Sequence, residues 1–128
     1  MIKIRIGMPA TKSGANVILV DNGKILLLLR EGGWKSSHWG PPGGGVDKGE
    51  TPEQAAVRET FEESGLRVKP EDLELLIQRT KHNYGMIYFY ITDKFSGKDI
   101  KLSYEHSDFA WVDIKKIDEY NTTFEPGE

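Results

Sequence analysis

A glycine-rich loop runs directly into a strongly signalled helix between Gly43 and Leu66, and this stretch constrains the fold more than any other. Thr51 suits the N-cap and Pro52 the first helical position, and Gln54 completes a capping box three residues after the cap. Gly65 can end the helix in a left-handed conformation. The sequence therefore predicts one well-defined helix, with a loop held against its start.

The predicted helix has two distinct faces, because an α-helix turns about 100° per residue. Glu59, Glu62 and Glu63 are related by i, i+3 and i+4 and share one face. Arg58 lies one turn before Glu62 and can pair with it or with a loop carboxylate. A second face, expected to pack on a sheet, carries small or apolar side chains at Ala56, Val57, Thr60, Phe61 and Ser64.

Three glutamates on one helix face repel each other, at a cost of roughly 0.2–0.5 kcal/mol per pair when exposed. A divalent cation would remove this repulsion, and hard oxygen ligands suit Mg²⁺ or Mn²⁺. A solvated acidic face explains the same residues, so the helix alone leaves both interpretations open. The loop is similarly open: Gly43, Gly44, Gly45 and Gly49 allow close backbone approach to a ligand or metal, but a tight surface turn would also use them.

The spacing between loop and helix favours the metal interpretation. Gly44, five residues, Glu50, seven residues and then the run from Arg58 to Leu66, RETFEESGL, resembles the Nudix box G-x5-E-x7-R-E-U-x-E-E-x-G-U, where U is bulky and apolar. Every fixed position is filled, and the one departure is Thr60, which stands where an aliphatic residue is usual. Several specified residues at fixed spacing make a far more specific signal than a lone glycine motif.

The resemblance implies a hydrolase that uses Mg²⁺ or Mn²⁺ to cleave a diphosphate linkage. It makes Glu59, Glu62 and Glu63 the metal-ligand and base candidates, with the Gly43 carbonyl a further ligand. Arg58 would orient these carboxylates and Glu50 would brace the loop through Arg58. Glu105, in a loop before a tryptophan-containing strand, resembles a glutamate that some Nudix enzymes use as extra ligand or base, and Glu59 and Glu105 both stay open as the base. His106 and Asp108 are weaker candidates.

The substrate is specified less sharply. Trp34 and Trp39 could stack a nucleobase, and both could instead fill a gap between the loop and the sheet, which is the favoured role of Trp39 because it directly precedes the glycine turn. Lys35 could meet substrate phosphates, Gly44 could approach them, and Tyr84 resembles a tyrosine of diadenosine polyphosphate hydrolases. We expect a nucleoside polyphosphate, either a (d)NTP or a dinucleoside polyphosphate. ADP-ribose or another nucleotide sugar is the alternative substrate, and a non-catalytic nucleotide-binding Nudix module is the alternative function.

Strand-like segments surround the helix and indicate an α+β fold. Asn16 to Val20 and Lys24 to Arg30 flank Asp21-Asn22-Gly23 and predict a β-hairpin, and the continuous apolar run in the second strand predicts that both of its faces are covered. Further strands are expected over 73–81, 86–92 and 109–112, with a weak helix over 113–120. The resemblance implies a mixed central sheet in an α/β/α sandwich, here with a short or absent C-terminal helix.

The length of 128 residues suggests one domain, over residues 1–128. A net charge of −3 argues against general nucleic-acid binding, and the absence of cysteine excludes disulfides and thiol chemistry. The chain shows no secretory segment and no apolar run long enough for a bilayer, so a cytoplasmic protein without membrane association is expected. The short tail makes a homodimer reasonable.

Overall fold

The computed structural model describes residues 13–31, 37–80 and 85–122. Within these residues the chain forms seven strands, one α-helix and two short 3₁₀ helices. In order these are β1 (Gly14–Asp21), β2 (Lys24–Arg30), β3 (Trp39–Gly40), β4 (Gly43–Gly45), α1 (Pro52–Ser64), η1 (Pro70–Asp72), β5 (Glu74–Thr80), β6 (Met86–Thr92), β7 (His106–Asp113) and η2 (Ile114–Glu119). The α+β class predicted from the sequence is confirmed.

The β1–β2 hairpin is confirmed, and its turn explains the pairing register. Asn22 and Gly23 have φ of 52° and 75°. Two consecutive left-handed residues are what a two-residue type I′ turn requires, and Asn-Gly is the sequence that provides them at least cost. Val20 therefore pairs with Ile25 and Asp21 with Lys24.

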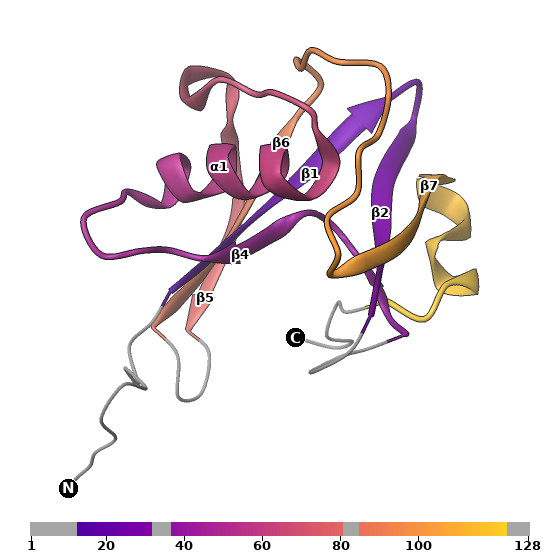
Figure 1. Cartoon of the computed structure of the whole chain (residues 1–128), viewed down its shortest axis with the longest axis horizontal. Helices are drawn as coiled ribbons and strands as arrows, with labels where there is room; N and C mark the ends of the chain where they lie inside the picture. The colour runs from indigo at the N-terminus through magenta and orange to yellow at the C-terminus, as the bar shows by residue number, and fades with distance from the viewer. Residues whose placement is uncertain (1–12, 32–36, 81–84, 123–128) are drawn as a thin grey trace, which may run out of the picture.

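β1 is the centre of the sheet, because three strands pair with it. Its start, Gly14–Asn16, pairs antiparallel with β4, its last residues pair antiparallel with β2, and β6 runs parallel along its other edge. The remaining pairs, β2–β3, β2–β7 and β5–β6, are antiparallel, so the sheet is mixed as expected. Figure 1 shows α1 lying across the β1, β4 and β6 part, with β7 and η2 beside β2.

Both faces of β2 are buried, in two separate apolar clusters. Leu26 and Leu28 join the cluster that includes residues of β1 and α1, whereas Ile25 and Leu27 join a second cluster with Val112. The alternation follows from the strand period of two. The prediction that both faces of this strand are covered is confirmed, and the strand anchors the loop that leads to the site.

The ends of α1 match the sequence prediction, but one residue of its packing face does not. Thr51 caps the helix in a complete capping box with Gln54, and Gly65 ends it at φ 81°. Ala56 and Thr60 are buried, but Phe61 is 42 % exposed. Phe61 lies about 100° beyond Thr60, at the margin of the sheet-facing arc, so its predicted packing on the sheet was wrong. The Arg67 guanidinium covers its ring instead, 4.1 Å from the centroid.

Thr60 provides a test of the one departure from the Nudix box. Its side chain is fully buried, and its Oγ1 has no hydrogen-bond partner within the described segments. A buried unpaired hydroxyl is costly, so Thr60→Val, of nearly equal volume, is expected to raise the free energy of unfolding by about 1 kcal/mol. Urea unfolding with unchanged m-value measures this. A clear loss of stability would show that Thr60 makes a needed hydrogen bond.

The C-terminal element is short, as expected. The predicted weak helix is the 3₁₀ helix η2, and within residues 13–31, 37–80 and 85–122 α1 is the single α-helix. Tyr120, directly after η2, packs edge-on against Trp39 with ring centroids 5.4 Å apart. The second cluster is therefore closed by η2 and these two rings rather than by a full helix. Across these residues the structure contains no helix with the length and apolarity that spanning a bilayer requires.

Candidate active site

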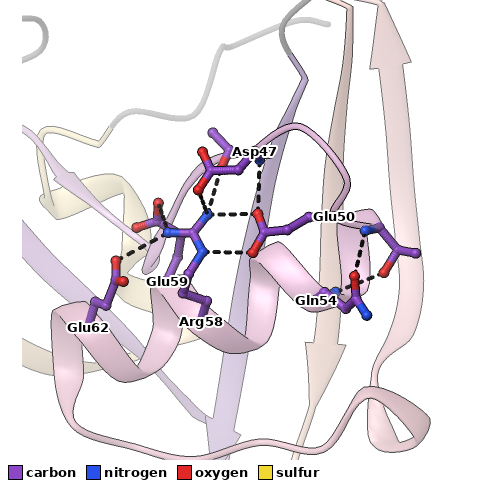
Figure 2. Close-up of polar contacts among 8 residues, drawn as sticks. Asp47, Glu50, Gln54, Arg58, Glu59 and Glu62 are labelled. Atoms are coloured by element: carbon purple, nitrogen blue, oxygen red, sulfur yellow. Dashed lines mark hydrogen bonds and ion pairs between the residues drawn. The ribbon is translucent and has the colours of Figure 1, made fainter.

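Arg58 is the centre of a polar network that joins the glycine loop to α1 (Figure 2). Its Nε and Nη2 donate to the two carboxylate oxygens of Glu50, at 2.8 and 2.9 Å. Its Nη2 also donates to the Gly45 carbonyl at 3.0 Å. A bidentate guanidinium–carboxylate pair fixes both distance and orientation. These bonds join the loop to the middle of the helix. Glu50 and Arg58 therefore make the contact that was expected to brace the loop.

Arg58 also contacts three further carboxylates. Its Nη1 donates to Glu59 at 3.1 Å and to Glu62 at 3.3 Å, and Asp47 lies 3.4 Å from Nη2. Hydrogen bonding to Glu50, followed by the charge of Glu59, raises the pKa of Arg58 above its already high value. The sequence analysis did not identify Asp47 as a partner of Arg58. Its position between the glycines and the helix, as an acidic residue, was the signal that could have indicated this contact.

Glu63 is the most buried of the helix glutamates, with 3 % of its surface exposed. Its Oε1 accepts a hydrogen bond from the Gly43 amide at 2.9 Å. Burial raises the pKa of Glu63 to about 8, against the lowering effect of the Gly43 hydrogen bond, and Glu59 raises it further. In the metal-free chain the Glu63 carboxyl therefore holds its proton to a higher pH than an ordinary glutamate does.

Glu59 lies between Arg58 and the loop, with a side chain that is 15 % exposed. Burial raises its pKa, while the charge of Arg58 and its hydrogen bond act in the opposite direction. A Cβ at Gly44 would stand 2.5 Å from the Glu59 carboxyl carbon, and one at Gly43 would stand 2.6 Å from the Ala15 carbonyl oxygen. Gly43 is thus required by its packing against backbone, whereas a side chain at Gly44 would displace the Glu59 carboxylate.

Glu62 and Glu105 lie at the outer side of the same site. The Glu62 side chain is 53 % exposed. Glu105 precedes β7, and its carbonyl accepts from the Glu31 amide at 2.8 Å. The charge of Glu105 contributes to the raised pKa of Glu63, so the two carboxylates are close enough to interact electrostatically. Asp108 is exposed and caps its own neighbour, with its Oδ1 accepting from the Phe109 amide.

His106 is a buried residue beside Glu105 that the sequence rated weakly. Its Nδ1 has no hydrogen-bond partner among the described residues. Burial, followed by the charge of Arg30, lowers its pKa. His106 is the first residue of β7 and pairs with Arg30 of β2. In the sequence, its position just before a predicted strand was the one available signal. The lowered pKa of His106 favours its neutral imidazole form.

The carboxylates match the chemistry of a divalent-cation site, although Arg58 and the Gly43 amide set their present positions. In the described parts of the chain no three acidic or histidine side chains converge to hold a metal. The reason is that Glu59 and Glu62 hydrogen-bond to Arg58 and Glu63 to the loop amide. Hard carboxylate oxygens are nevertheless the donors that Mg²⁺ prefers. Burial is the main reason that the pKa values of Glu59 and Glu63 are raised, so both carboxylates are costly to ionise without a cation.

The candidate substrate residues are placed only in part. Trp34, Lys35 and Tyr84 lie outside the described residues. Trp39 is half-buried in β3, its amide donates to the Asn121 carbonyl at 2.7 Å, and its ring packs on Tyr120. This is the gap-filling position considered for it, and nucleobase stacking by Trp39 stays a prediction.

The family model described as the NUDIX domain matches residues 10–127. The chain belongs to the Nudix hydrolase family. It is 33 % identical over 106 residues to a bis(5'-nucleosyl)-tetraphosphatase [asymmetrical] of Caenorhabditis elegans, covering 77 % of each chain. It is 36 % identical over 112 residues to an oxidized purine nucleoside triphosphate hydrolase of Danio rerio, covering 79 % of this chain and 65 % of the relative.

Among solved structures, this Nudix hydrolase resembles a MutT NUDIX hydrolase from Burkholderia pseudomallei. The TM-score is 0.73 at 27 % identity, with 82 % of this chain and 84 % of the other covered. The resemblance to the Nudix family inferred from the box is therefore confirmed over most of the chain.

Proposed function

We propose that this Nudix enzyme hydrolyses a diphosphate linkage in a nucleoside polyphosphate, with Mg²⁺ or Mn²⁺ as cofactor. The observation that carries the proposal is the buried Glu63, held on the Gly43 amide beside Glu59 on the same helix. Burying several carboxylates beside a glycine loop is costly unless a cation and an anionic ligand meet there. We infer that one domain over residues 1–128 carries this activity, and cytoplasmic localisation stays a prediction from the sequence.

The residues that would hold the metal are Glu59, Glu62, Glu63 and Glu105, with the Gly43 carbonyl. A bound divalent cation neutralises phosphate charge and lowers the pKa of a coordinated water. Arg58 holds the helix carboxylates and the loop in one frame through its hydrogen bonds to Glu50 and Gly45. Glu59 or Glu105 would take the proton of the attacking water, and the raised pKa of Glu59 suits that task.

The names of the relatives support a nucleoside polyphosphate as substrate. A tetraphosphatase acting on bis-nucleosyl compounds and a hydrolase of oxidized purine triphosphates stand at 33 % and 36 % identity. Both substrate classes contain a phosphoanhydride chain joined to a nucleoside. The dinucleoside polyphosphate has the additional support of Tyr84, while nucleotide sugars such as ADP-ribose stay the alternative substrate.

A substrate panel with Mg²⁺ tests the proposal. Phosphate and pyrophosphate release would be measured on (d)NTPs, oxidised purine triphosphates, dinucleoside polyphosphates and ADP-ribose, with EDTA as the metal-free control. We expect turnover on a polyphosphate that EDTA abolishes. Turnover on ADP-ribose alone would show that the substrate is a nucleotide sugar and not a nucleoside polyphosphate. Nucleotide binding without turnover on any compound would support a non-catalytic binding module.

The edge strand β5 supports the homodimer considered from the sequence. Within the described residues β5 pairs with β6 alone, and its consecutive Leu75, Leu76 and Ile77 are large exposed apolar residues, Leu76 at 54 %. Exposed apolar edge strands tend to pair with another chain. We infer that two copies associate through β5.

Leu76→Lys is expected to convert such a dimer to a monomer, because the charge would be buried at the pairing edge. Sedimentation velocity across a range of protein concentrations measures the change. Thr80→Lys, an exposed position at the end of the same strand, is the matched control and should leave the dimer intact. A wild-type chain that stays monomeric at the highest concentration would contradict the β5 interface.

A further inference from the structure

A second concave site lies on the flank of α1 away from the glutamates. It has a volume of about 500 Å³ and lies between Val57 and Phe61 of α1, the segment 67–69 and the segment 94–96 that follows β6. This size is within the range of pockets that hold small organic ligands. We call it the α1 rear pocket.

The α1 rear pocket combines apolar walls with positive charge. Val57, Phe61 and Phe95 provide apolar surface, and Arg67, Lys69 and Lys94 line it together with one carboxylate, that of Asp72. Within the described residues none of the three cations forms an ion pair. A cationic pocket is unexpected in a chain of net charge −3, because scattered surface charges would follow the overall balance.

The backbone around the pocket is held in place without any ligand. Arg67 and Ser96 exchange two backbone hydrogen bonds, each 3.0 Å long. The Lys94 amide donates to Thr92 Oγ1 at 3.0 Å. Phe95 is backed by Trp111, with nearly parallel rings 5.9 Å apart. The two segments that carry the cations are therefore fixed relative to each other, and a ligand would meet a preformed surface.

The pocket is separate from the metal-ligand candidates. Glu59 stands two residues from both Val57 and Phe61, so its side chain projects about 200° away around the helix axis. The Arg67 guanidinium lies over the Phe61 ring, on the pocket side of the helix. One helix thus presents carboxylates on one flank and a cation-lined cavity on the other.

We propose that the α1 rear pocket binds a small organic anion, with its apolar body against Phe61, Phe95 and Val57 and its anionic group between Arg67, Lys69 and Lys94. The Arg67 guanidinium lies over the Phe61 ring. A planar guanidinium can bind a carboxylate or phosphate while it packs on an aromatic ring, so this pair suits a ligand with both an apolar body and an anionic group. The site is independent of the proposed hydrolysis.

Amide chemical-shift titration of the full chain in EDTA tests this proposal. The probes are phenyl phosphate, benzoate, inorganic phosphate and benzyl alcohol. We expect saturable shifts of residues 67–69 and 94–96 with phenyl phosphate or benzoate, which combine an aromatic ring with an anionic group. Inorganic phosphate lacks the ring and benzyl alcohol lacks the charge, so each should bind about tenfold or more weakly. A preference between the first two probes identifies the anionic group. Shifts confined to residues 43–45, or equal affinity for inorganic phosphate, would overturn the proposal.

Two variants locate the binding further. Lys94→Ala should raise the dissociation constant about fivefold or more, since one charge-assisted contact is lost. Lys98→Ala, an exposed lysine outside the pocket, is the matched control and should leave it unchanged. An unchanged dissociation constant in Lys94→Ala, with wild-type spectra elsewhere, would overturn the assignment.

Discussion

Replacing Glu63 by glutamine is expected to reduce metal-dependent turnover by about a hundredfold or more while the fold persists. The amide retains the size of the side chain and can still accept from the Gly43 amide, but it cannot bind a divalent cation as a carboxylate does. Steady-state kinetics at saturating Mg²⁺ measure the effect. Glu62→Gln, at the exposed edge of the same helix face, provides a comparison in which a smaller loss is expected. Near-wild-type kinetics in Glu63→Gln would remove Glu63 from the metal site.

The same variant should stabilise the metal-free protein at alkaline pH. Burial raises the folded-state pKa of Glu63 from 4.5 to about 8, so its favourable contribution is complete below the ordinary carboxyl pKa and is lost as pH rises through about 8. Glutamine cannot ionise, so the difference in unfolding free energy between variant and wild type should grow from pH 5 to pH 8.5. Mg²⁺ should reduce this difference.

Thermal unfolding in EDTA at several pH values measures this trend. The lowered pKa of His106 acts in the opposite direction, since its contribution is lost as pH falls through the ordinary histidine value and below. Comparing variant with wild type removes that contribution, because His106 is present in both. A difference that does not change with pH would contradict the raised pKa of Glu63.

Replacing Arg58 by alanine is expected to cost about 2–3 kcal/mol of stability, between the values for exposed and fully buried ion pairs. The variant would leave Glu50 and Glu59 without their guanidinium partner and the Gly45 carbonyl without its donor. Turnover should fall as well, because loop and helix would no longer be held in one frame.

Arg58→Lys distinguishes positioning from charge. Lysine keeps one positive charge but cannot form the two parallel hydrogen bonds to Glu50. We expect it to recover part of the stability and little of the turnover, with unfolding and kinetics measured side by side. Lys48→Ala, on the neighbouring loop, is the control for a lost surface charge. Full recovery of turnover in Arg58→Lys would show that charge alone is needed.

The helix and its caps could be predicted because their signals are local. Thr51, Gln54 and Gly65 act within a few residues of one another, and the structure places each as expected. The hairpin turn at Asn22-Gly23 is local in the same sense. The exposure of Phe61 could not be predicted, because it depends on where the sheet ends beneath the helix.

In the candidate site too, the features set by local sequence could be predicted, and those set by tertiary packing could not. The spacing of Arg58, Glu59 and Glu63 on one helix could be predicted directly, and so could the pairing of Arg58 with a loop carboxylate. The burial of Glu63 against the Gly43 amide depends on how β4 pairs with β1, which no local pattern specifies. The α1 rear pocket was missed for the same reason, since its walls come from segments that are distant in sequence.

The parallel pairing of β1 with β6 has a consequence for how the chain folds. It joins Asn16 to Phe89 and Ile18 to Ile91, residues far apart in the chain. Closing so long a loop is entropically costly, and non-local pairing of this kind slows folding. The hairpin and the capped helix are formed from neighbouring residues. We therefore expect the rate of refolding to be set by the parallel pairing of β1 with β6, while α1, which carries the candidate metal-binding glutamates, can form early.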